Sequence, residues 1–137
     1  MNMEKKIAIY GWAFDPPQLA HETIARETVS KFWLDKLVIV PSWSHRFKTY
    51  KTTDEYRRKI AEIFVESIGL DKVELNTVFL DWLLVNTTLN TDKYFTEKFW
   101  VRPYQIFGSD LIESFWQWDP TGEVAMRIPK ILVKRPG

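Results

Sequence analysis

The stretch IAIYGWAFDPPQLAH, residues 7–21, decides the fold. Ile7 to Tyr10 form an apolar run long enough for a buried strand, and Gly11 follows it. From Leu19 onwards the apolar residues recur with helical spacing, so the stretch predicts a strand, a tight loop and the start of a helix. A helix N-terminus offers free N–H groups and a positive dipole to a phosphate, and His21 lies in the first turn, where it could donate to one. A plain loop capped by Asp15, with His21 exposed on the helix, is the alternative.

The same alternation continues along the chain. Further strand-like runs occupy residues 37–40, 72–79, 104–107 and 131–133, and helical patterns occupy 19–33, 52–68 and a short segment from Thr91. We expect buried helical stripes of Ala20, Ile24, Ala25, Val29, Phe32 and Trp33, and of Tyr56, Ile60, Ile63, Phe64 and Ile68. Thr52 and Glu55 resemble a capping box, and Gly69 stands where a C-terminal cap belongs.

Strand–helix alternation at this spacing predicts an α/β fold, a parallel sheet with helices on both faces. Ligands of such sheets bind beyond the carboxyl ends of the strands, near the point where the strand order reverses. Residues 11–21, 41–48 and 108–110 follow the first, second and fourth predicted strands, and are therefore the candidate ligand-binding segments.

The composition excludes several classes of protein. A length of 137 residues suggests a single domain, residues 1–137, and the lack of cysteine excludes disulfides and cysteine-ligated zinc. A net charge of +1 does not favour nucleic acid as a partner. The aromatic content of 15% is too high for a disordered chain, and no apolar run reaches the roughly 20 residues of a membrane helix. We expect a cytoplasmic protein, with no nucleic-acid or membrane partner, and its aromatic residues make a homo-oligomer a hypothesis.

The segment from Gly11 to His21 resembles the G-[GST]-[FT]-F-D-P-x-H-x-G-H motif that opens the nucleotidylyltransferase superfamily. Within it the chain resembles the bacterial nicotinate-nucleotide adenylyltransferases, which act on nicotinate or nicotinamide mononucleotide. Further matches follow in order: residues 34–41 to the second strand, Lys48 to the lysine of a P-P-H-K loop, Arg57 to the arginine of H-R-L-x-M, Gly108-Ser109-Asp110 to G-x-D, Phe115 and Trp118 to F-x-x-W, and residues 134–137 to the closing R-P-G.

This resemblance implies a Rossmann-like, doubly wound parallel sheet of five strands in the order 3-2-1-4-5. It also implies an enzyme that transfers AMP from ATP to nicotinate or nicotinamide mononucleotide, with Mg²⁺ present and pyrophosphate released, in NAD biosynthesis. The mononucleotide phosphate attacks the α-phosphorus of ATP directly, so the enzyme needs positioning and charge stabilisation but no protein nucleophile. No cysteine, and no serine in a strand–turn–helix elbow, is present in the sequence.

The resemblance also implies the roles of individual residues. His21 and Lys48 would be catalytic and contact phosphates. ATP would lie against Gly11, Trp12, Ala13, Phe14, Asp15, Gln18, His21, Gly108 and Asp110. The mononucleotide would contact Trp118, whose indole stacks well on a pyridine ring, together with Thr88 and Lys48. No residue is expected to ligate a metal.

Each of these residues has a structural alternative. Lys48 could belong to a plain basic loop, Asp110 could cap the helix that follows it, and Trp118 could be a core or interface residue. Arg57 could pair with Asp54 or with solvent. These alternatives are left open by the sequence.

The chain also departs from the family motif. Gln18 replaces the first motif histidine and cannot carry its positive charge, Ala20 replaces a glycine, and Trp12 replaces a small residue. No S-S-T-x-x-R segment follows Arg135-Pro136-Gly137, and loss of its phosphate donors is expected to cost on the order of 10²–10³-fold in rate. Two alternative functions remain. The chain could be a degenerate nucleotide-binding module, or it could be a superfamily member with another acceptor, either phosphopantetheine or the substrate of a cytidylyl transfer.

Overall fold

The computed structural model describes residues 5–12, 14, 17–42, 54–81, 87–109 and 127–134. Five parallel strands form a sheet in the order β3-β2-β1-β4-β5. They are β1 (Ile7–Trp12), β2 (Lys36–Pro41), β3 (Val73–Leu75), β4 (Tyr104–Gly108) and β5 (Lys130–Val133). The helices are α1 (Leu19–Lys31), α2 (Asp54–Ile68) and α3 (Thr88–Phe99). The α/β class, the parallel sheet and its strand order are therefore confirmed.

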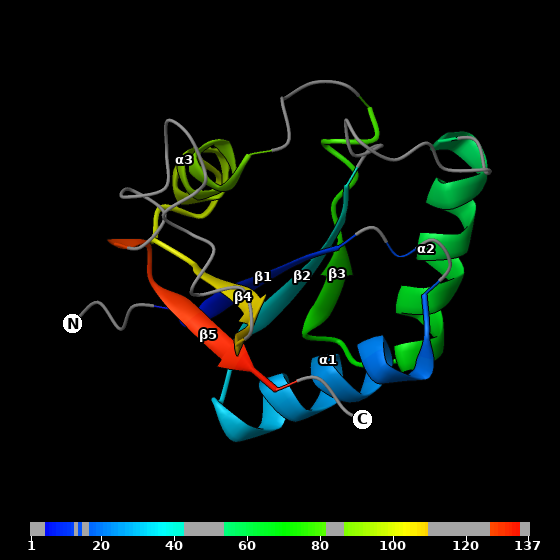
Figure 1. Cartoon of the computed structure of the whole chain (residues 1–137), viewed down its shortest axis with the longest axis horizontal. Helices are drawn as coiled ribbons and strands as arrows, with labels where there is room; N and C mark the ends of the chain where they lie inside the picture. Colours follow the sequence, from blue (N-terminus) through cyan, green and yellow to red (C-terminus); the bar gives the residue numbers. More distant parts are fainter. Residues whose placement is uncertain are drawn as a thin grey trace.

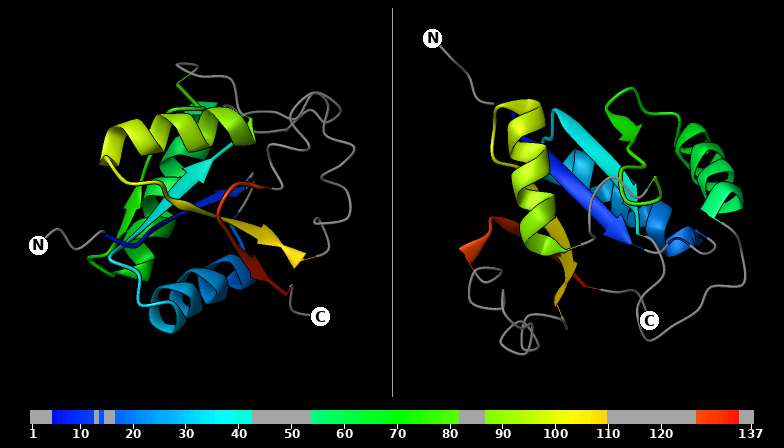
Figure 2. Two further views of the ribbon diagram at one scale, coloured as in Figure 1. Left: turned by 90° about the vertical axis from the view of Figure 1, so that its left-hand side faces the viewer. Right: turned by 90° about the horizontal axis from the view of Figure 1, so that it is seen from above.

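The helices lie on both faces of the sheet. α1 and α2 cover one face and α3 covers the other (Figure 1 and Figure 2). The chain moves outward from β1 through β2 to β3, then returns to place β4 on the other side of β1. Because such crossovers are right-handed, this change of direction puts α3 on the opposite face and makes the carboxyl ends of β1 and β4 the switch point of the fold.

Two apolar clusters join these layers, and β1 contributes to both. Ala8 and Tyr10 belong to the cluster beneath α1 and α2, whereas Ile7 and Ile9 belong to the cluster beneath α3, where Phe95 is completely buried. Successive residues of a strand point to opposite faces, so a strand buried on both sides must be apolar throughout. The uninterrupted apolar runs in the sequence reflect this burial.

The predicted buried stripe of α2 is partly wrong. Phe64 and Ile68 are buried as expected, but Ile63 is 65% exposed and Tyr56 is 56% exposed. Arg57 and Ala61 take the inner positions instead, being 2% and 1% exposed. Residues 57, 61, 64 and 68 have the same helical spacing as the predicted set, so the periodicity alone did not decide which face was buried. Thr52, the predicted cap, lies outside the described residues.

The predicted limits of α1 and α3 also need correction. Phe32 and Trp33, expected in the buried stripe of α1, follow its last residue and are 38% and 83% exposed. α3 begins at Thr88 rather than at Thr91, because the Oγ1 of Thr87 accepts the backbone N–H of Asn90 at 3.0 Å and caps the helix. Thr91 is instead buried, and its hydroxyl donates to the carbonyl of Thr87.

Candidate active site

The candidate site lies at the carboxyl edge of the sheet, where β1 ends and α1 begins. Gly11 and Trp12 pair with Val40 and Pro41 of β2, and the N–H of Ser42 donates to the carbonyl of Trp12 at 2.9 Å. Gly11 is exposed, and a Cβ placed on it would meet the Val40 carbonyl oxygen at 3.6 Å. This is an ordinary van der Waals distance, so a side chain at this position would not clash with the backbone of β2.

His21 is held by the backbone at the start of α1. The N–H of Gln18, the N-cap residue, donates to the Nδ1 of His21 at 2.8 Å, and the N–H of His21 donates to the carbonyl of Gln18 at 2.9 Å. Because Nδ1 accepts a hydrogen bond, the proton of the neutral imidazole resides on Nε2. His21 thus presents an N–H donor beside the positive end of the α1 dipole, an arrangement suited to an anionic oxygen.

Aromatic rings surround this imidazole. The ring of Phe14 lies edge-on at 4.9 Å from that of His21, and the rings of Trp12 and Tyr10 lie at 6.1 Å and 6.3 Å. Their packing leaves the imidazole few alternative orientations, and they supply an apolar wall on which charge interactions are stronger than in water. The orientation of His21 is therefore fixed both by a backbone hydrogen bond and by its neighbours.

Phe14 anchors the loop between β1 and α1 in the core. Its side chain is 2% exposed and packs on Tyr10 at 5.3 Å and on Phe64 of α2 at 5.7 Å. Its φ of 49° is left-handed, a conformation that costs a bulky L-residue roughly 1–2 kcal/mol. Burial of the ring offsets this strain, and strained backbone of this kind gathers at functional sites.

Charges in the first turns of α1 are paired. The carboxylate of Glu22 accepts from the Nε of Arg26 at 3.0 Å, and the Nη2 of Arg26 donates to the carbonyl of Ile68 at 2.9 Å. The guanidinium thereby offsets an acidic group near the candidate phosphate position and interacts favourably with the negative end of the α2 dipole. In the described part of the chain, no group of three or more His, Asp or Glu side chains could hold a metal ion.

The structure brings five of the predicted site residues together, namely Gly11, Trp12, Phe14, Gln18 and His21. Gly108 ends β4 at the same edge of the sheet, and Thr88 opens α3. The carbonyl of Thr88 accepts from the Nε2 of Gln105 at 3.0 Å, which ties the start of α3 to β4. The remaining predicted site residues, Ala13, Asp15, Lys48, Asp110 and Trp118, lie outside the described residues.

Arg57 is buried, so the alternative that it faces solvent is wrong, whereas its pairing with Asp54 stays a prediction. Neither solvent nor the protein surface surrounds its side chain, which is 2% exposed, and its Nη2 donates to the carbonyl of Ser42. No periodic signal singled out this position, since the stripe of residues 57, 61, 64 and 68 shares its spacing with the predicted stripe. A buried guanidinium needs hydrogen-bond acceptors, and the carboxyl end of β2 supplies one.

Curated relatives of the chain share one function in their names. A scan against family models gave no match. A protein of Aliarcobacter butzleri named "Probable nicotinate-nucleotide adenylyltransferase" is 29% identical over 137 residues, which cover 96% of this chain and 72% of that protein. A protein of the same name from Campylobacter fetus is 30% identical over 117 residues, which cover 82% of this chain and 62% of that protein. These relatives support the assignment of the chain to the nicotinate-nucleotide adenylyltransferase family.

Solved structures agree with this family at the level of the fold. The Plasmodium falciparum nicotinic acid mononucleotide adenylyltransferase complexed with NaAD superposes with a TM-score of 0.75 and 20% identity, over 98% of this chain and 77% of that one. The same enzyme complexed with APC gives a TM-score of 0.70. Nicotinate-nucleotide adenylyltransferases are nucleotidyltransferase enzymes, and the chain belongs to that class.

The chain is shorter than the family members that it matches. It spans 72% of the Aliarcobacter butzleri protein and 59% of a relative from Thermotoga. None of the described helices is long and apolar enough to cross a membrane.

Proposed function

We propose that the chain transfers AMP from ATP to nicotinate mononucleotide. In this reaction a phosphate oxygen of the mononucleotide attacks the α-phosphorus of ATP. The new P–O bond forms the dinucleotide, the bond from the α-phosphorus to the bridging oxygen breaks, and pyrophosphate leaves with the electron pair. The step needs no oxidant and no covalent intermediate on the protein. Nicotinamide mononucleotide is the second acceptor to be tested.

One observation carries the proposal: the hydrogen bond from the Gln18 N–H to the Nδ1 of His21 at the start of α1. It leaves Nε2–H as the donor toward an ATP phosphate, and the α1 dipole adds a positive potential at the same place. Charge that develops on the transferring phosphoryl group is stabilised by donors already oriented before the reaction. The rings of Trp12 and Phe14 pack on the imidazole and hold this donor in place.

Mg²⁺ enters this proposal with its substrate. The described residues offer no acidic cluster for the ion, so we assign its ligation to the phosphates of ATP. Bound there, the ion neutralises phosphate charge and orients the pyrophosphate leaving group. The family resemblance implies a phosphate contact for Lys48, a ribose contact for Asp110 and a pyridine contact for Trp118, and these roles are part of the proposal. A cytoplasmic location and a single domain over residues 1–137 remain predictions.

A coupled assay tests the function directly. Purified protein with ATP and Mg²⁺ is expected to release pyrophosphate and form the dinucleotide with nicotinate mononucleotide, at a higher kcat/KM than with nicotinamide mononucleotide. Binding of ATP without turnover on either acceptor would instead support the degenerate nucleotide-binding module. Turnover with phosphopantetheine, or with CTP in place of ATP, would assign the chain to another branch of the superfamily.

The state of His21 can be checked without any substrate. The ¹⁵N chemical shifts of a neutral imidazole differ between its two tautomers, and we expect the Nε2–H form for His21. The Nδ1–H form, or rapid averaging of the two, would remove the oriented donor on which the proposal depends.

A further inference from the structure

A chain of contacts runs from α2 to the candidate active site through the carboxyl end of β2. The Nη2 of Arg57 donates to the carbonyl of Ser42, and the N–H of Ser42 donates to the carbonyl of Trp12 at 2.9 Å. The ring of Trp12 lies 6.1 Å from that of His21. Arg57 is thus two hydrogen bonds away from a residue that packs beside His21.

The position of Ser42 makes this connection mechanically useful. Pro41 is the last residue of β2 and pairs with Trp12, so the regular ladder between the two strands ends there. The N–H of Ser42 continues the pairing by one more hydrogen bond, and its carbonyl is engaged by Arg57 from α2. Both backbone groups of Ser42 are thereby fixed at the edge where the nucleotide is proposed to bind.

The neighbouring arginine provides a contrast within the same helical turn. Arg58 has a one-third exposed side chain that forms an ion pair with Asp81, and the other carboxylate oxygen of Asp81 accepts from the hydroxyl of Thr77. Arg58 therefore ties α2 to the segment after β3, away from Trp12. The two adjacent guanidinium groups on one helix thus contact the chain beyond two neighbouring strands, β2 and β3.

We propose that Arg57 is a positioning residue that holds the carboxyl ends of β1 and β2 in the arrangement adenylyl transfer requires. The proposal rests on the proposed function and adds a residue that touches neither substrate. Its charge is buried, so the side chain cannot exchange its Ser42 contact for water without opening the core. A displacement of about 1 Å at a reacting group can lower a rate on the order of 10²-fold, which is enough for a distant clamp to matter.

The test compares Arg57→Met with Arg58→Met, two neutral substitutions of similar length on adjacent residues. Arg57→Met is expected to lower kcat about 10²-fold with less than a threefold change in the KM for ATP, whereas Arg58→Met is expected to keep kcat within about threefold. Arg57→Lys, which keeps the charge and can still donate to the Ser42 carbonyl, is expected to recover part of the lost kcat. Rates are normalised to the folded fraction, measured by circular dichroism. Equal kcat values for the two methionine variants would overturn the proposal.

Two further measurements keep the outcome decisive. Should both Arg57 variants fail to fold, Ser42→Pro removes the N–H that donates to Trp12 and leaves Arg57 in place. It is expected to lower kcat as Arg57→Met would, and an unchanged kcat would refute the positioning role. Should the unaltered chain form no dinucleotide, the proposed function fails by itself. Amide exchange then decides the clamp: Ser42 must lose protection in Arg57→Met but not in Arg58→Met.

Discussion

The two edges of the sheet use tryptophan in opposite ways. At the carboxyl edge Trp12 is half-buried and lies with Phe14 against the imidazole of His21. At the amino edge Trp33 follows α1 and Trp100 follows α3, and their side chains are 83% and 92% exposed. The aromatic rings at the carboxyl edge fix the orientation of one polar side chain, whereas the two tryptophans at the amino edge are exposed to solvent. Aromatic content alone therefore says little about where a site lies.

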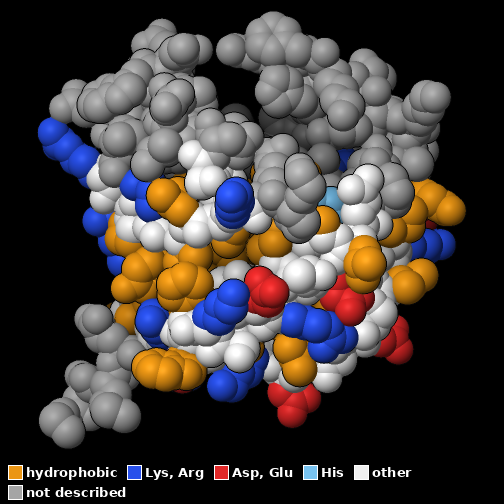
Figure 3. Space-filling model, turned by 60° about the horizontal axis from the view of Figure 1, so that its bottom comes forward, with side chains coloured by type: hydrophobic (Ala, Val, Ile, Leu, Met, Phe, Trp, Pro, Cys, Tyr) orange, Lys and Arg blue, Asp and Glu red, His pale blue; other side chains and the backbone are white. Residues whose placement is uncertain are grey.

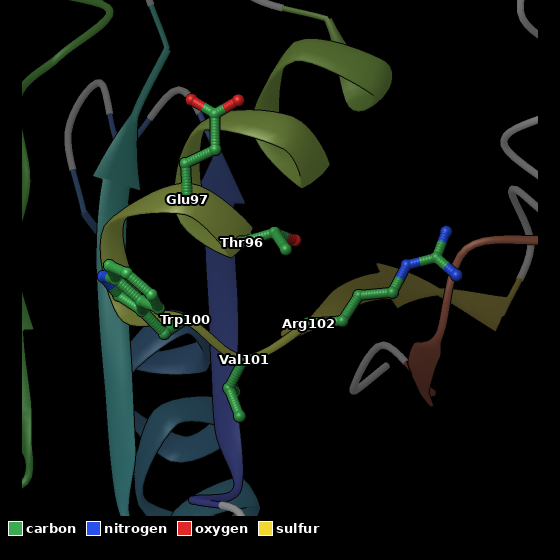
Figure 4. A pocket seen from close by; sticks show the side chains of 5 residues that line it. All are labelled: Thr96, Glu97, Trp100, Val101 and Arg102. Carbon is green, nitrogen blue, oxygen red and sulfur yellow. The ribbon is translucent and has the colours of Figure 1, made fainter.

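The same contrast holds for the space at each edge. A hollow of about 570 Å³ at the amino edge is lined by Thr96, Glu97, Trp100, Val101 and Arg102. Figure 4 shows these side chains pointing away from one another, so no polar groups converge on a common point. Arg102 is instead paired with Asp92 at 3.2 Å. On the face that Figure 3 shows, groups of apolar side chains alternate with charged side chains.

His21→Ala is expected to have the largest effect of any substitution at the carboxyl edge. Removing the oriented Nε2–H donor should lower kcat by on the order of 10²–10³-fold, the usual cost of losing one such donor. Steady-state kinetics with ATP and nicotinate mononucleotide measure it. Trp100→Ala, at the opposite edge, is the control and should stay within twofold. An active His21→Ala variant would remove His21 from the mechanism.

Phe64→Ala tests how far the carboxyl edge depends on α2. The ring of Phe64 is 8% exposed and supports Phe14, so its removal should lower the free energy of unfolding by about 3 kcal/mol. Ile63→Ala changes the adjacent residue, which is 65% exposed, and should cost less than about 0.5 kcal/mol. Urea denaturation of both variants gives the comparison. Similar losses would mean that the outer face of α2 is covered.

The two ends of α3 allow the edges to be compared within one helix. Thr87→Ala at the carboxyl edge deletes the cap that accepts from the N–H of Asn90, and should lower the free energy of unfolding by about 1 kcal/mol. Thr87→Ser keeps a hydroxyl acceptor and should stay within a few tenths of a kcal/mol of the original chain. Chemical denaturation distinguishes the two. A loss of the same size in Thr87→Ser would show that the cap is not the cause.

Trp100→Gly at the other end of α3 is expected to have the smallest effect, and the opposite sign. Trp100 has a φ of 60°, which costs roughly 1–2 kcal/mol for an L-residue, while glycine adopts it freely at a smaller entropic cost. The net gain should be about 0.5 kcal/mol in the free energy of unfolding, since the exposed indole contributes little burial. Trp100→Ala keeps the strain and is the control. A glycine variant less stable than the alanine variant would show that the entropic cost of glycine exceeds the strain that it relieves.

Much of the fold could be predicted because it follows from long apolar runs. The strand Leu37–Val40 is buried on both faces, so its sequence could not be anything but apolar. The inner face of α2 could not be predicted in the same way, since two stripes shared one period and a buried Arg57 overrode the hydrophobic choice. The start of α3 was wrong because Thr87 and Thr91 are equally good caps in sequence, and only backbone geometry separates them.

The candidate site was predictable only where a motif carried it. The resemblance predicted His21 beside Gln18, but not that Nδ1 would accept from the Gln18 N–H, since this contact depends on the backbone conformation of the N-cap. Arg57 was placed by the motif and yet its contact with Ser42 was not foreseen, because it joins residues 15 apart across two elements. Contacts between side chains and distant backbone atoms leave no periodic signal in a sequence.

The central position of β1 also constrains how the chain is made. β1 leaves the ribosome first and soon meets β2, but its other neighbour, β4, begins only at Tyr104. Roughly 90 residues of synthesis separate the two, which takes about 5 to 20 s at common elongation rates. Through that interval the strand that leads into the His21 loop has one bare edge, open to pairing with another nascent chain. The strand that leads to the candidate phosphate site therefore keeps one unpaired edge until β4 has been synthesised.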